Sequence, residues 1–393
     1  MPLRPLALWE RNLVACLLGS ITTVMAMTLM LPFLPLYVEQ LGVSGHREIV
    51  QWSGIAFSAT FITAGLVAPL WGYLGDRFGR KKMLIRASLG MAICMTLMGL
   101  VSDIWQLVAL RLIIGLAGGY SSGAMILVAI QTPKERAGQA LGLLTAGIMV
   151  GNLLGPLIGG LLPAIIGLRA IFWGAGAVIF LAFLSTVYFV REAPPAVAQK
   201  SKTAGSWAEI RKPRIIAAML VSGLVLMMAN MSIEPILTVY VSGLVENPAH
   251  ATSVAGLVMS AAALGSIVSS FQLGKLADRI GYKPIIILAL VLASLLLIPQ
   301  AFVTQSWQLI ALRFLMGLAL GGLLPCIAAV IRHNVPESYI GTVLGYSISC
   351  QFAGQFLGPL LGGFIGGHLG ISWVFLFTSL ILAASALYVH RSN

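Results

Sequence analysis

Apolar runs that stay unbroken over helical lengths constrain this chain more than any other feature of its sequence. A helix that crosses a lipid bilayer needs about 20 consecutive apolar residues, whereas the strands of a membrane β-barrel alternate apolar and polar positions. Only 9% of the 393 residues are charged, against about 25% in a soluble domain, which excludes a soluble enzyme and a disordered chain. We predict an all-α membrane protein with twelve spans, at 12–38, 50–73, 83–102, 105–130, 139–162, 169–190, 215–244, 253–273, 284–303, 307–331, 340–366 and 371–389.

The positions of the basic residues indicate how the spans are oriented. The net charge is +12, with 24 Lys and Arg in all. If the N-terminus is cytoplasmic, Arg47 and Arg169 lie outside. Arg111 and Arg313 lie within spans, which leaves 24 − 4 = 20 basic residues in tails and loops on the cytoplasmic side. This bias predicts that both termini are cytoplasmic, and it does not indicate nucleic-acid binding, which needs a basic patch on a folded surface.

The sequence contains an internal repeat. Segments that align at an offset of 202 or 203 residues are 72–79 with 274–281, 105–111 with 307–313, and 151–156 with 354–359. This offset covers six spans and a linker, so the two copies run in parallel, which is a transporter architecture. We predict a six-helix bundle at 1–190, a cytoplasmic linker at 191–214 with a short surface helix around Trp207 to Arg211, and a second six-helix bundle at 215–393.

The turn between the second and third spans carries a dense motif, Gly-x-Leu-x-Asp-Arg-x-Gly-Arg-Lys-Lys, at 72–82. Glycine permits close helix approach, the aspartate can accept from helix N-terminal amides or pair with an arginine, and the basic run can anchor the loop at anionic lipid headgroups. A charged turn that merely fixes topology would explain the basic run alone. The candidate residues are Gly72, Asp76, Arg77, Gly79 and Arg80, with Asp278 and Arg279 in the second copy.

This loop resembles the signature motif of the major facilitator superfamily, and the whole chain is similar to the twelve-span drug/proton antiporters of that superfamily. Residues 31–42, LPFLPLYVEQLG, resemble its bacterial multidrug exporters. The resemblance implies a bacterial inner-membrane protein that uses a proton gradient and no cofactor. It also implies that Asp76 is a conformational latch, which meets the start of the eleventh span across the two halves and steadies the outward-facing state.

Glycines recur every four residues along the fifth span. One glycine per turn makes a groove for another helix backbone, and a proline beside the third removes a hydrogen-bond donor and loosens the helix locally. Packing is part of their role. The pattern also resembles the signature that separates the superfamily's antiporters from its symporters, which favours export. Its residues are Gly147, Gly151, Gly155, Pro156 and Gly159.

Two arginines lie within the predicted spans. Arg111 is about six residues into the fourth span, roughly 9 Å from its outer end at 1.5 Å per residue, and Arg313 is its counterpart in the repeat. An arginine at that depth indicates pairing or function, with snorkelling to the outer headgroups as the alternative. The resemblance places Arg111 at an arginine linked to proton transfer, although Ile114 replaces the polar residue usually found before Gly115.

Glu234 in the seventh span is the one carboxylate deep within an apolar run. Removal from water favours the neutral form of a carboxylate, which suits Glu234 to exchanging a proton for a cationic substrate. The alternatives are a structural ion pair with Arg313 and a position in an outer vestibule. Many relatives carry an acid in the first span, whereas this chain has none there before Glu39.

Polar, methionine and aromatic side chains within the spans are candidates for the wall of a substrate cavity. Methionines and flat rings can repack around ligands of different shape, and the scarcity of hydrogen-bonding groups favours a hydrophobic or amphipathic ligand over a sugar. Each residue alone is as consistent with ordinary core packing. The candidates are Tyr37, Tyr120, Met125, Asn152, Asn230, Met231, Tyr240 and Gln355.

Catalysis is not expected of this chain. The pattern Gly-x-Ser-x-Gly at 119–123 resembles a hydrolase elbow, but it lies within a span and no histidine falls deep in a span to serve it. No Walker-type ATP site is present, and the four cysteines lie in apolar runs, which indicates neither disulfides nor a metal site.

We therefore predict a monomeric, multi-pass secondary transporter that exports hydrophobic or amphipathic small molecules in exchange for protons by alternating access. The alternative is uptake of a small metabolite or organic anion, by proton symport or facilitated diffusion. In that case Arg111 or Arg313 would hold the anion.

Overall fold

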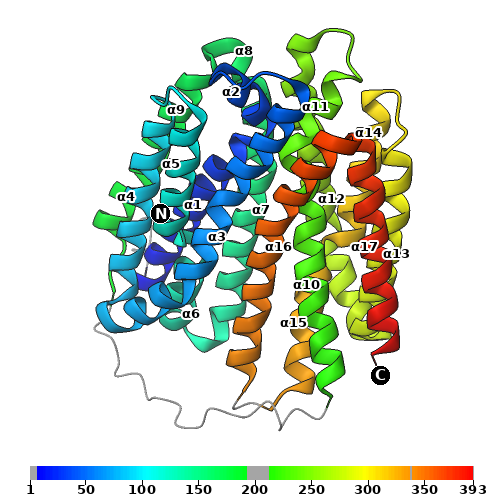
Figure 1. Ribbon diagram of the computed structural model, residues 1–393. Helices are drawn as coiled ribbons and strands as arrows, with labels where there is room; N and C mark the ends of the chain where they lie inside the picture. Colours follow the sequence, from blue (N-terminus) through cyan, green and yellow to red (C-terminus); the bar gives the residue numbers. More distant parts are fainter. Residues whose placement is uncertain (1–6, 193–211, 337–338, 393) are drawn as a thin grey trace, which may run out of the picture.

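The computed structural model describes residues 7–192, 212–336 and 339–392, and in these ranges the chain is helical between its turns (Figure 1). Two bundles lie side by side, one from each half of the sequence. The N-terminal bundle comprises α1 (Leu8–Leu29), η1 (Leu31–Phe33), α2 (Leu34–Gln40), α3 (His46–Phe78), α4 (Arg80–Met98), α5 (Ile104–Ala117), α6 (Tyr120–Gln131), α7 (Lys134–Leu161), α8 (Pro163–Ile166) and α9 (Leu168–Phe189).

The C-terminal bundle comprises α10 (Pro213–Ile233), η3 (Glu234–Ile236), α11 (Leu237–Ser242), η4 (Pro248–His250), α12 (Ala251–Ile280), α13 (Tyr282–Gln300), α14 (Ser306–Leu320), α15 (Leu323–Asn334), α16 (Ile340–Leu369) and α17 (Ile371–Arg391). The surface helix expected around Trp207 to Arg211 lies outside the described residues.

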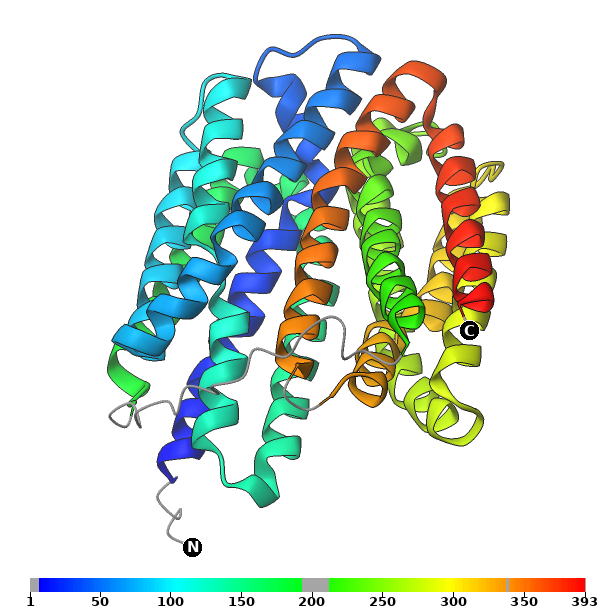
Figure 2. The same cartoon turned by 60° about the horizontal axis from the view of Figure 1, so that its bottom comes forward.

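The N-terminal half finishes and the C-terminal half starts at the same end of the molecule. We call it the linker end, because α9 ends there and α10 begins there, and we call the opposite end the far end (Figure 1). Helix α1 also begins at the linker end and α17 ends there, as the view with this end turned forward shows (Figure 2). The described chain therefore starts and finishes on one side, as an even number of spans requires.

The predicted spans correspond to helices in the structure. Among the described residues, eleven helical stretches are long and apolar enough to cross a membrane. The third expected span, α4, is not one of the eleven because its first two turns carry Arg80, Lys81, Lys82 and Arg86. Helix α4 nevertheless packs against α5 and α9 inside the N-terminal bundle, which places it in the third of twelve span positions.

The fourth and tenth spans are each made of two helices. Helix α5 ends at Ala117 and α6 begins at Tyr120, while α14 ends at Leu320 and α15 begins at Leu323. Glycine pairs fill both gaps, and Gly119 has a φ of +99°, which glycine adopts without strain. The Gly-x-Ser-x-Gly pattern therefore begins at a helix break, not inside a helix as expected from the sequence.

Glycines let the long helices pack closely within each bundle. A Cβ placed on Gly151 would lie 2.9 Å from the carbonyl oxygen of Ile21, so α7 and α1 touch backbone to backbone. The second half repeats this packing, because a Cβ on Gly358 of α16 would lie 2.6 Å from the carbonyl oxygen of Met228 on α10. The groove expected from the glycine spacing is thus filled by the first helix of the same bundle.

The two bundles meet at the far end through the pairs α3–α16 and α7–α12. A Cβ on Gly160 of α7 would lie 2.6 Å from the carbonyl oxygen of Thr252 on α12, and one on Gly363 of α16 would lie 3.1 Å from that of Val50 on α3. The Thr238 hydroxyl also donates to the carbonyl of Pro32 across the halves, at 2.6 Å. We call these contacts the far-end seam.

The same four helices are separated at the linker end. Glycines on their linker-end turns face open space, with nothing within 4 Å of an added Cβ; they are Gly72 on α3, Gly138 and Gly142 on α7, Gly274 on α12, and Gly341 and Gly345 on α16. The two bundles are therefore in contact at the far end and apart at the linker end, so the molecule is closed at the far end and open at the linker end.

Candidate functional site

Arg111 lies on α5, facing α3 inside the N-terminal bundle. Its side chain is fully buried, and its Nε donates to the carbonyl of Ala56 at 3.1 Å. The guanidinium carbon lies 5.1 Å from the centre of the Phe57 ring, while Nη1 and Nη2 have no hydrogen-bond partner among the described residues. A side chain with no exposed surface does not snorkel to the headgroups, so that alternative is wrong for this conformation.

Arg313 occupies the equivalent position on α14. Arg313 is 4% exposed, and its guanidinium carbon lies 5.9 Å from the centre of the Phe375 ring. Nε and Nη2 have no hydrogen-bond partner among the described residues. Both repeats thus bury an arginine whose donors are only partly satisfied, which is unfavourable in a low-dielectric interior unless a partner arrives at another stage of a working cycle.

Glu234 begins η3, at the point where the seventh span breaks before Pro235. This short helix packs against α10 and α16 of its own bundle and against α3 and η1 of the other, so Glu234 lies on the boundary between the halves. Its side chain is partly exposed.

An ion pair with Arg313 is one of the roles that the sequence leaves open for Glu234. The ion pairs within 4.0 Å among the described residues are Arg80–Asp76 and Arg136–Glu10. The contact ion pair considered for Glu234 and Arg313 is therefore not formed in this conformation, and the carboxylate has no hydrogen-bond partner in the part of the chain that the structure describes.

The motif at 72–82 forms the tight turn between α3 and α4 at the linker end. Gly79 has a φ of +98°, which permits the turn, and Arg80 pairs with Asp76 one helical turn earlier. In the second copy, Asp278 instead accepts from the hydroxyl of Tyr282, at 2.5 Å. Arg77 is exposed, as is Arg279 in the repeat. Asp76 contacts its own loop here, not the start of α16, and the expected latch is open.

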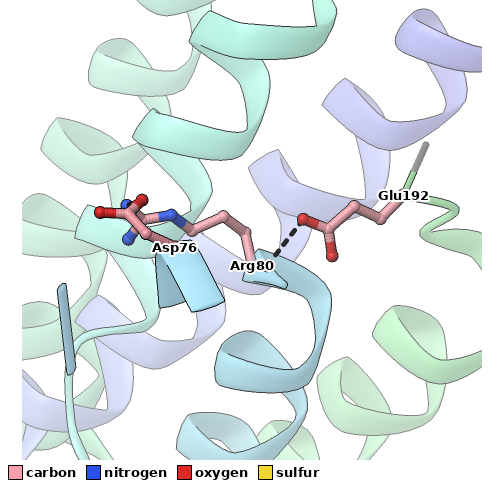
Figure 3. A network of polar contacts seen from close by, with 3 residues as sticks. All are labelled: Asp76, Arg80 and Glu192. Carbon is pink, nitrogen blue, oxygen red and sulfur yellow. Dashed lines mark hydrogen bonds and ion pairs between the residues drawn. The ribbon is translucent and has the colours of Figure 1, made fainter. Parts of the chain in front are cut away.

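A carboxylate not singled out from the sequence completes this loop. Glu192, beyond the end of α9, accepts from the backbone N–H of Arg80 at 2.7 Å (Figure 3). It also accepts from the backbone N–H of Lys81, at 2.8 Å. It therefore caps the N-terminus of α4, where an anion is favoured by the unpaired amides. In the sequence, Glu192 is a single acidic residue at the edge of the predicted linker. That observation alone does not predict a helix cap.

The tyrosines expected at a cavity lie in the bundle cores. Tyr37 is fully buried, with its hydroxyl on the Met98 carbonyl, and Tyr240 donates to the Gln300 carbonyl at 2.7 Å. The Tyr120 hydroxyl shares a 2.8 Å hydrogen bond with Thr186. The structure thus gives these tyrosines packing positions, because each hydroxyl finds a partner inside its own bundle.

The other expected cavity residues retain exposed surface. Asn152 on α7 is exposed, and Met125 on α6 is partly buried. Asn230 and Met231 are partly exposed on α10, and the Gln355 amide of α16 lies 3.5 Å from the Met227 sulfur of α10. The structure therefore brings Gln355 close to the α10 methionines, on one wall of the C-terminal bundle, while Met125 and Asn152 belong to the N-terminal bundle.

Two repeated helical bundles that close at one end, each burying a partly satisfied arginine, with a carboxylate at their boundary, define a membrane transporter. The chain belongs to the Major Facilitator Superfamily, whose sequence pattern matches residues 16–247 and 237–392. It is therefore not an enzyme. The superfamily match covers nearly the whole chain, and its two matched ranges overlap at 237–247, within the C-terminal bundle.

Relatives and solved structures agree with this assignment. The chain is 43% identical over 386 residues to the multidrug resistance protein MdtG of Enterobacter lignolyticus (strain SCF1), covering 98% of this chain and 92% of that one. It is 42% identical to the protein of the same name from Salmonella arizonae, covering 98% and 96%. A solved bacterial homolog of the human lysosomal transporter Spinster has the same fold, with a TM-score of 0.77, 15% identity, and coverage of 97% and 96%.

Proposed function

We propose that this chain is a secondary active transporter that exports hydrophobic or amphipathic small molecules in exchange for protons. The observation that carries the proton coupling is Glu234, a carboxylate at the boundary between the halves that has no ion-pair or hydrogen-bond partner among the described residues. The names of the MdtG relatives support drug efflux as the direction and substrate class.

The proposed cycle uses the two ends of the molecule in turn. The conformation described here is open at the linker end, and the positive-inside bias supports a cytoplasmic linker end, with both termini on that side of a bacterial inner membrane. Drug would enter from this side. Rocking of the bundles about the central boundary would then open the far-end seam, and proton entry to Glu234 would lower the affinity for the drug. One chain contains both halves, so we propose a monomer.

Uptake of an organic anion is the second candidate. The unpaired guanidinium nitrogens of Arg111 and Arg313 favour it, because guanidinium groups bind carboxylates well. Arg111 has no exposed surface in this conformation, so an anion would reach it only after the bundles rearrange.

Glu234→Gln tests the export proposal. In proteoliposomes with an imposed pH gradient, we expect this variant to lose pH-driven transport of a lipophilic cationic dye while still binding the dye. The matched control is Glu246→Gln, an exposed carboxylate in the loop after α11, which should transport normally. Unaltered pH-driven efflux by Glu234→Gln would remove this residue from the mechanism.

Expression in a pump-deficient bacterium separates export from uptake. Raised resistance to several lipophilic compounds is the expected result. Unchanged resistance together with accumulation of a single nutrient would support the second candidate.

A further inference from the structure

A pocket of about 210 Å³ lies at the far end, between the two halves. Its N-terminal side is formed by Leu36 and Glu39 of α2 and by His46 of α3, and its C-terminal side by Thr238, Val239 and Ala251. This pocket is separate from Glu234 and from the open linker end. We call it the far-end pocket.

The chemistry of the far-end pocket selects a cation with an apolar body. Most of its wall is hydrocarbon, and the Glu39 carboxylate has no hydrogen bond or ion pair among the described residues. Arg47 does not form an ion pair with this carboxylate, and its guanidinium instead contacts His368 of α16. A single carboxylate is too few oxygen ligands for a divalent metal, and it repels anions.

The size of the far-end pocket limits the cation to a small one. Pockets for drug-sized ligands hold about 300–1,000 Å³, so 210 Å³ suits a compact alkylammonium. We infer that the far-end pocket is a binding site for small alkylammonium cations, with Glu39 as the counter-ion.

An occupant of the far-end pocket would touch both halves at once. Thr238 lines the pocket and also donates to the Pro32 carbonyl across the far-end seam. A ligand that fits only while the seam is closed shifts the population toward that state. Alkylammonium added at the far end therefore slows opening of the seam, a consequence that rests on the proposed alternating access, whereas the binding itself does not.

Titration of the purified protein with tetraethylammonium, followed by calorimetry at pH 8, tests the binding. We expect Glu39→Gln to bind tetraethylammonium about tenfold more weakly, because it loses the electrostatic attraction between the carboxylate and the cation. The control is Glu48→Gln, which removes a carboxylate from the first turn of α3 but lies outside the pocket. Equal affinity in Glu39→Gln and the native chain, or no binding by the native chain, would overturn the proposal.

A thiol reporter tests the effect on the seam. Ser253, whose hydroxyl donates to the Gly160 carbonyl at 3.0 Å across the seam, is replaced by Cys in a chain whose four native cysteines are replaced by Ser. Tetraethylammonium should slow modification of this cysteine several-fold, and Glu39→Gln should abolish that protection. Binding without protection would overturn the conformational part of the inference and leave the site itself supported.

Discussion

At the residue scale, the two buried arginines of the spans, Arg111 and Arg313, each have two side-chain nitrogens without a hydrogen-bond partner among the described residues. Arg111 has one hydrogen bond, to Ala56, and two nitrogens without partners. Replacing a buried, poorly paired charge by an apolar side chain of similar length is often stabilising. Because burying the Arg111 charge costs stability, a role in function explains this arginine better than a role in folding.

Arg111→Met separates these two roles. We expect the variant to be more stable, by about 1–4 kcal/mol, and to lose proton-driven transport. Thermal unfolding in detergent measures the first effect and the proteoliposome assay the second. A variant that is less stable yet transports normally would show that Arg111 is structural.

At the element scale, glycines determine how closely the fifth and eleventh spans pack against their neighbouring helices. Helix α7 lies against α1 and α16 lies against α10, with carbonyl oxygens of one helix facing glycines of the other. Close packing of this kind depends on the missing Cβ, because interiors have little free volume. The glycine spacing was readable in the sequence. Its partner helix was not, since many helices offer an apolar face.

Gly155→Ala measures this packing. A Cβ at Gly155 would lie 2.7 Å from the carbonyl oxygen of Met25, so we expect destabilisation of about 1–3 kcal/mol. Gly142→Ala on the same helix meets nothing within 4 Å and should be neutral or up to about 1 kcal/mol more stable. Thermal unfolding of both variants provides the comparison. Equal changes of stability in the two variants would show that the close contact of Gly155 with α1 does not exclude a side chain.

At the scale of the whole molecule, the conformation depends on which end of the bundles is packed. The far-end seam is held by backbone contacts at glycines such as Gly160, whereas the linker-end glycines face open space. Bulky side chains should therefore act oppositely at the two ends of a single helix.

Gly160→Leu and Gly142→Leu on α7 form the matched pair. We expect Gly160→Leu to force the far end apart, because its Cβ would lie 2.6 Å from the Thr252 carbonyl oxygen. Gly142→Leu should fit the open linker end and hold it open. Distances between spin labels, on cysteines replacing Lys134 and Arg332 at the linker end and Ile165 and Glu246 at the far end, report both changes. Identical distance distributions in the two variants would contradict the arrangement described here.

Asp76→Asn tests whether Asp76 stabilises the conformation in which the linker end is closed. In the open state Asp76 pairs with Arg80, and we propose that it reaches α16 only when the linker end closes. The variant should shift the linker-end label distances toward the open state by weakening the closed one. Unchanged distances, and unchanged labelling of the Ser253→Cys reporter from the far end, would count against this role.

The amino-acid sequence alone determined the membrane class, the positions of the spans, the duplication and the clustering of basic residues, because hydropathy, charge and repeats are properties of short segments. It also pointed to Arg111 and Glu234, since a charge stands out within an apolar run. Only the tertiary structure decided that the far end is closed, that Glu192 caps α4, and that Tyr37 and Tyr120 belong to bundle cores. These features depend on contacts between residues far apart in the chain, where packing and hydrogen-bond satisfaction choose one partner among many.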